Sequence, residues 1–127
     1  MDAINKINKF AGVDWSLDKI FVSDEIAVCL LNEKGHRITI SCHNFIGFSF
    51  VGYWAERTIE HIKVEPEGDL INDSLMKIKS IYGEHPLPAG ENKKIDGIWN
   101  QLDLKLIDGN VIKVACEDFT FDIGVHK

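Results

Sequence analysis

Cys42 and His43 are adjacent side chains of types that bind metals and that act together as nucleophile and base in some enzymes. Zinc sites usually take two ligands from one turn, as Cys-x-x-Cys or His-x-x-x-His, and the chain contains neither spacing. On a strand, successive side chains point to opposite faces, so Cys42 and His43 cannot share an ion. We therefore expect Cys42 to be a buried thiol, and we predict no metal site and no cofactor.

The chain also lacks the short motifs of common catalytic and phosphate-binding sites. It has no Gly-x-Ser-x-Gly and no glycine-rich phosphate loop, and residues 65–73 lack the ligand spacing of an EF-hand. The acids of that segment are better explained as the start of a helix, with Asp69, Asn72 or Asp73 as its N-cap. A catalytic site made of two carboxylates stays an alternative, because a chain with 20 acidic residues commonly brings some of them close together. A non-enzymatic role is therefore favoured over an enzyme.

Aromatic side chains are concentrated in residues 45–54, which hold five of the twelve in the chain. Such a segment is typical of a ligand pocket or a partner-binding surface, but also of a buried strand whose glycines mark a bulge. Burial is favoured for Phe48 and Phe50. Core and interface are weighted equally for Tyr53 and Trp54, which lie at the strand end. Trp99 is the other candidate for an exposed aromatic.

Acidic side chains give the chain a formal net charge of −6, and most of this charge is local. Residues 56–73 carry six acids against Arg57 and Lys63, a local net charge of −4, and residues 117–122 add three more acids without a base. The overall sign argues against nucleic-acid binding, which needs a basic surface. Such a charged segment is usually a solvated face, and the sharper alternative is a docking patch for a basic partner.

Periodicity predicts two helices and several antiparallel strands. Apolar residues recur at helical spacing in residues 2–11 and 70–82. Three hairpins follow from placing apolar residues on one face. The first pairs Ile20 with Val28 and Val22 with Ile26, and the second pairs Ile26 with Cys42, Val28 with Ile40 and Leu30 with Ile38. The third pairs Leu102 with Cys116, Leu104 with Val114 and Leu106 with Ile112. Further strands are expected at residues 45–51, 55–64 and 119–125.

These elements predict one globular domain over residues 1–127. We expect an α+β fold that is predominantly antiparallel β: a single curved sheet, sandwich or half-barrel of about seven or eight strands, with a short N-terminal helix and one helix near residues 70–82. The N-terminus has no apolar signal region, and the longest apolar run, Ile26–Leu31, is far too short to span a bilayer. With three cysteines, an odd number, we expect a soluble cytoplasmic protein with reduced thiols and no membrane partner.

In its size, acidity and lack of catalytic motifs, the chain resembles the immunity and inhibitor proteins that neutralise bacterial toxins. This resemblance implies a small acidic, non-enzymatic protein-binding domain that docks a basic protein partner. The contact residues expected for it are Tyr53, Trp54, Glu56, Glu60, Glu65, Glu67 and Asp69.

Two other hypotheses stay open. One is a small-molecule-binding or catalytic β-barrel-like domain, with a pocket lined by Phe48, Phe50, Trp54, His61 and Trp99. The other is a homo-oligomer joined through a sheet edge.

Overall fold

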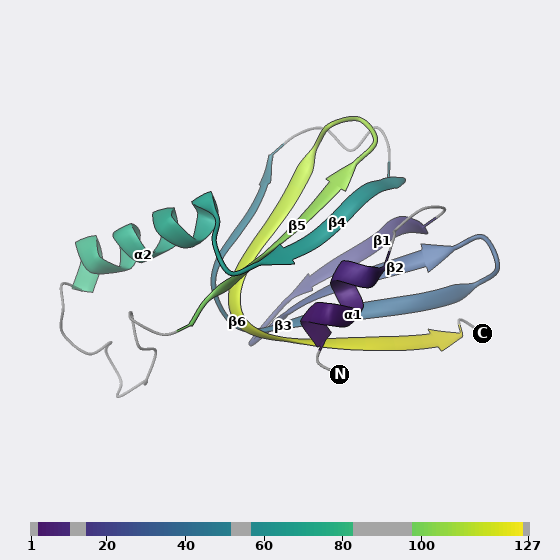
Figure 1. Cartoon of the computed structure of the whole chain (residues 1–127), viewed down its shortest axis with the longest axis horizontal. Helices are drawn as coiled ribbons and strands as arrows, with labels where there is room; N and C mark the ends of the chain where they lie inside the picture. The colour runs from purple at the N-terminus through teal and green to yellow at the C-terminus, as the bar shows by residue number, and fades with distance from the viewer. Residues whose placement is uncertain (1–2, 11–14, 52–56, 83–97, 126–127) are drawn as a thin grey trace.

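The protein is a curled antiparallel sheet with two helices. The computed structural model describes residues 3–10, 15–51, 57–82 and 98–125 (Figure 1). Its elements are α1 (Ala3–Lys9), β1 (Trp15–Val22), β2 (Ile26–Asn32), β3 (His36–Val51), β4 (Ile59–Glu65), α2 (Asp69–Tyr82), β5 (Asn100–Leu106) and β6 (Val111–Val125). The strand order is β1-β2-β3-β6-β5-β4, and the sheet forms a half-barrel. The predicted α+β class is confirmed. The described residues form six strands, because residues 45–51 continue β3 and residues 119–125 continue β6.

The two long central strands, β3 and β6, connect two halves of the sheet. The two strands pair with each other along their whole length, from His36 opposite Val125 to Val51 opposite Val111. On its other edge, β3 pairs with β2 through residues 37–42, and β6 pairs with β5 through residues 111–116. Figure 1 shows both strands changing direction midway. The register shifts there between Phe45 and Gly47, so the predicted bulge is confirmed, and Asn44 has a left-handed backbone with φ of 55°.

The core lies on the inner face of the curled sheet, where the alternating apolar residues meet. Two predicted hairpins have the expected register, since Ile20 and Val22 lie opposite Val28 and Ile26, and Ile26, Val28 and Leu30 lie opposite Cys42, Ile40 and Ile38. The inward apolar side chains of β2 and β3 from Ile26 to Cys42 are almost completely buried. Alternation therefore predicted the buried face correctly.

The β5–β6 hairpin closes two residues away from the predicted register, so that prediction was wrong. Leu104 lies opposite Ile112 instead of Val114, and the other predicted pairs move by the same amount. The prediction put Gly109 in the middle of the loop. In the structure it is the last loop residue, with φ of 93°, as Gly35 is in the β2–β3 loop with φ of 83°. Because the shift is two residues, the same side chains still face the core.

Helix α1 lies against the open side of the half-barrel, between β4 and β6. Its Ile7 is completely buried in the core. The side-chain amide of Asn8 donates to the carbonyl of Val64 at 3.0 Å and accepts from the amide of Val64 at 2.6 Å, so it binds the edge of β4 as a neighbouring strand would. The sheet edges themselves meet at one antiparallel bridge, Ser16 with Thr58. The half-barrel is therefore nearly closed at this seam.

Helix α2 packs on the outer face of the other half of the sheet. Gly47, Ala115 and Gln101 lie side by side on β3, β6 and β5. A side chain at Gly47 would collide with the hydroxyl of Ser74, so this glycine lets α2 approach closely. Ile71 of α2 is buried there with Ala115.

The first turn of α2 is capped mainly by a side chain of strand β5. The side-chain oxygen of Gln101, a buried residue of β5, accepts from the amides of Leu70 at 2.9 Å and Ile71 at 3.2 Å. Of the three predicted caps, Asp69 accepts from Leu70 at 2.8 Å. The carbonyl of Gly68 accepts the first helical hydrogen bond. A side chain at Gly68 would collide with Gln101, so the glycine makes room for this cap.

Candidate functional site

The predicted acidic contact segment is partly neutralised by three lysines, two of which come from other strands. Tyr53, Trp54 and Glu56 lie outside the described residues. Glu67 is exposed, and the remaining three acids form ion pairs: Glu60 with Lys105 at 3.7 Å, Glu65 with Lys63 at 2.9 Å, and Asp69 with Lys113 at 2.6 Å. Lys105 and Lys113 are distant in sequence, so counting charge along the chain overlooks them. The segment is less negative in the folded protein than its sequence indicates.

Asp69 and Lys113 each stabilise the charge of the other. The ammonium group of Lys113 and the amide of Gln101 hold the pKa of Asp69 down at about 2, and the carboxylate in turn raises the pKa of Lys113. Gln101 donates to Asp69 at 3.0 Å and to Asp103 at 2.8 Å. This cluster joins α2 to the sheet, which makes it a structural device at the start of the helix.

The predicted aromatic pocket residues that the structure describes lie apart. Phe48 and Phe50 are on the inner face of β3, where Phe50 packs against the core. Phe48 is 39% exposed, so its expected burial was wrong. His61 is exposed on the outer face of β4. Trp99 is buried beneath α2 with only 5% exposure, so its expected exposure was wrong. The cause is α2, which covers the outer face at this point. Trp54 lies outside the described residues.

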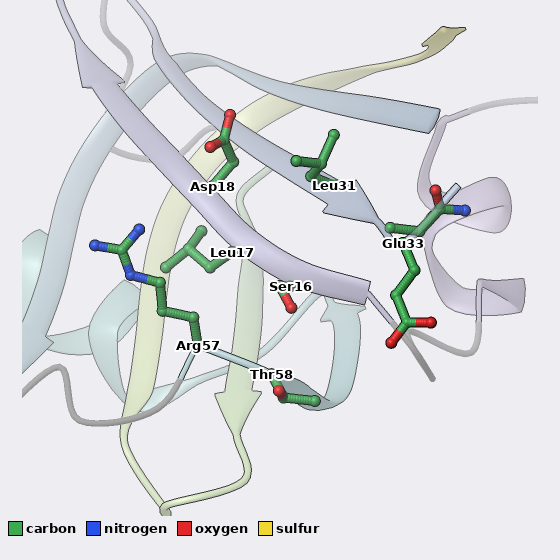
Figure 2. Close-up of a pocket in the computed structure, with 8 residues that line it drawn as sticks. Ser16, Leu17, Asp18, Leu31, Glu33, Arg57 and Thr58 are labelled. Atoms are coloured by element: carbon green, nitrogen blue, oxygen red, sulfur yellow. The ribbon is translucent and has the colours of Figure 1, made fainter. Parts of the chain in front are cut away.

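A polar cavity of about 390 Å³ lies at the seam between β1 and β4 (Figure 2). Leu17, almost fully buried, forms part of its wall, and its amide donates to the carbonyl of Arg57 at 2.9 Å. Figure 2 shows Arg57 and Glu33 on opposite sides of the cavity, while Asp18 pairs with Arg37 at 3.5 Å. The lining therefore carries both signs of charge and favours neither a cation nor an anion.

A second cavity, of about 430 Å³, lies where β3 changes direction, and we name it the bend pocket. Its lining residues are Ser23, Asp24, Glu25, His43 and Asn44. The β1–β2 turn supplies the first three, and this turn is closed by a hydrogen bond from the amide of Ser23 to the carbonyl of Glu25 at 2.9 Å. The lining contains two carboxylates and no lysine or arginine. On β6, Asp118 lies directly opposite His43.

Glu25, His43 and Thr120 form a continuous polar chain at this pocket, which we name the relay. A carboxylate oxygen of Glu25 lies 2.7 Å from Nδ1 of His43, and Nε2 of the same ring lies 2.7 Å from the hydroxyl oxygen of Thr120. A carboxylate at Nδ1 favours the tautomer that carries its proton there, which leaves Nε2 to accept from the hydroxyl. The arrangement can withdraw a proton from Thr120.

Half of the relay was visible in the sequence. The predicted register that puts Ile26 opposite Cys42 also puts Glu25 beside His43. The pairing of β3 with β6 brings Thr120 to His43, because it places Thr120 opposite Ser41. No local pattern indicates that long-range pairing.

The cysteines are buried and have no role in these sites. All three are free thiols, and Cys42 is completely buried, as predicted. A hydrogen bond with Cys116 and burial raise the pKa of Cys42 far above its usual range, so it is not a nucleophile. Within residues 3–10, 15–51, 57–82 and 98–125, no three histidine, cysteine or acidic side chains are grouped to hold a metal ion. No helix among those residues is long and apolar enough to cross a membrane.

No protein-family model, no curated protein and no solved structure matches the chain.

Proposed function

We propose that the protein is a small acidic protein-binding domain, of the immunity or inhibitor type, that docks a basic partner through the bend pocket. Its size, net charge of −6 and antiparallel architecture support a compact recognition domain. Three free, buried thiols support a cytoplasmic location. The pocket replaces residues 56–73 as the centre of the proposed contact.

The charge of the bend pocket is the observation that carries this proposal. Asp24 and Glu25 line a concave surface that has no lysine or arginine in its lining, where the one basic side chain is His43, the partner of Glu25, and Asp118 lies opposite His43 on the adjoining strand. In contrast, Glu60, Glu65 and Asp69 each lie against a lysine. A guanidinium or ammonium group therefore finds more uncompensated negative potential at the bend than along residues 60–69.

Such a contact has two physical consequences. Opposite charges accelerate association and impose orientation, and the effect falls with salt because the screening length shortens to about 8 Å at physiological ionic strength. The pocket is also large enough to receive one long side chain. Arginine suits it best, because its planar guanidinium forms paired hydrogen bonds with carboxylates.

Nuclear magnetic resonance with a short arginine peptide tests the proposal. We expect chemical-shift changes centred on Asp24, Glu25 and His43, which weaken as salt is added. Asp24→Lys should weaken binding at least tenfold. Glu67→Lys is the matched control, since it makes the same change of charge at another exposed acid and should have little effect.

Three results would contradict docking at the bend pocket. These are shifts centred on residues 60–69, equal losses in the two lysine variants, or binding that does not respond to salt. Unchanged spectra outside the substituted residue show that each variant is folded.

A further inference from the structure

We propose that the relay makes Thr120 a nucleophile that accepts the acyl group of small esters. This inference goes beyond docking and does not depend on it. It rests on the arrangement of three side chains from separate elements and on the open cavity beside them.

The geometry of the relay is that of an activated hydroxyl. Both contacts of the His43 ring are 2.7 Å, one to the Glu25 carboxylate and one to the Thr120 hydroxyl. A carboxylate on the far nitrogen orients the imidazole, fixes its tautomer and stabilises the imidazolium that forms when Nε2 takes a proton. The hydroxyl, the base and the orienting acid are thus present in order.

The backbone holds the three side chains in place. His43 and Thr120 extend from paired strands, where Ser41 lies opposite Thr120. Glu25 is held by the hydrogen-bonded β1–β2 turn. Asn44 follows His43 with φ of 55°, a conformation that is uncommon outside glycine and that occurs disproportionately at functional sites.

The relay is accessible to a substrate. Thr120 is exposed, and the side chains of His43 and Glu25 are 35% and 42% exposed. His43 also lines the bend pocket, so a small molecule in this cavity lies beside the relay. Because Asp24 and Glu25 line the same cavity, esters with a cationic group should react faster than neutral ones.

The chemical step is a transfer of the acyl group to Thr120. The hydroxyl oxygen attacks the carbonyl carbon of the ester and forms a new C–O bond, while its proton passes to Nε2 of His43. The original ester C–O bond then breaks, and the departing alkoxide takes that proton from His43. The products are acyl-Thr120 and an alcohol, and no atoms or electrons are left over.

Reaction with p-nitrophenyl acetate tests the inference, with release of nitrophenol measured by absorbance and the acetylated residue located by peptide mass spectrometry. We expect acetylation of Thr120, which Thr120→Val abolishes. Thr39→Val is the matched control, because Thr39 is a threonine on the same outer face of β3 and β6. It should leave acetylation of Thr120 unchanged.

The two other members of the relay have distinct tests. His43→Gln should slow acetylation of Thr120 about 100-fold, the usual order of a general base. Glu25→Gln keeps the size of the positioning side chain and should also slow acetylation, and the slowing should appear in kcat with KM unchanged, because the carboxylate contacts His43.

The inference is overturned if Thr120 is not acetylated, or if it is acetylated equally in the His43→Gln protein. Either result would show that the three side chains only join neighbouring strands. Binding of the arginine peptide to the Thr120→Val protein is measured in parallel, so that docking and acylation succeed or fail separately.

Discussion

Replacing Gln101 with methionine should weaken the attachment of α2 to the sheet. Methionine keeps the length and volume of the side chain but removes its hydrogen-bonding groups. Gln101 is only 3% exposed, and its oxygen accepts from the amides of Leu70 and Ile71. Leu70 retains the carboxylate of Asp69 as a partner, whereas the amide of Ile71 loses the acceptor that Gln101 provides.

The expected loss follows from these contacts. A buried donor without a partner costs about 1–3 kcal/mol, and the loss of a helix cap costs about 1 kcal/mol. The two descriptions overlap, so we expect Gln101→Met to lower the free energy of unfolding by about 2 kcal/mol. Asp69 and Asp103 add little, because neither side chain is fully buried and both can bind water instead.

Urea denaturation measures this change, and hydrogen exchange shows where it occurs. The amides of Leu70 and Ile71 should exchange faster in the variant. Lys105→Met is the matched control on the same face of β5, where an exposed ion pair at 3.7 Å contributes less than about 0.5 kcal/mol. A loss in Gln101→Met no larger than in this control, with unchanged exchange at Ile71, would refute the capping role.

Two further predictions concern the same helix. Because the pKa of Asp69 is about 2 in the folded protein and 3.8 ordinarily, its contribution to stability is present above about pH 4 and is lost as the pH falls through 2. Asp69→Asn should therefore be less stable than the wild type at pH 7, by under about 1 kcal/mol given its exposure, and the difference should shrink as the pH falls and disappear below pH 2 in urea titrations. Gly47→Ala should lower the free energy of unfolding by about 1–3 kcal/mol, because the new methyl group meets the hydroxyl of Ser74. Ser74→Ala in the same chain should recover part of this loss in thermal unfolding, and full additivity of the two changes would contradict the close approach.

The sequence predicted the faces of the strands better than their neighbours. Alternation with a glycine at the end of a short loop determines the β2–β3 register, because a one-residue slip would bury Arg37 or Thr39. The β5–β6 loop admits two positions for Gly109 that keep the same residues inside, so apolar pairing could not distinguish them. Only the need for a left-handed residue at the end of the loop decides between them.

Features that depend on elements distant in the chain could not be predicted from the sequence. Trp99 was expected to be exposed because its own strand leaves it on the outer face, and its burial needs the position of α2. The same applies to charge, since Lys113 reaches Asp69 only after β6 takes its place in the sheet. Local patterns thus predict which side of a strand is dry, but not what covers the other side.

The pairing of β3 with β6 also constrains how the protein folds. Its register runs from His36 with Val125 to Val51 with Val111, so the two central strands join regions far apart in the sequence. The β2–β3 hairpin can form early from local contacts, but β3 acquires its second neighbour only as residues 111–125 are synthesised. Folding rates fall as contacting residues become more distant in sequence. During synthesis on the ribosome, one edge of β3 therefore lacks its native partner until nearly the whole domain has emerged.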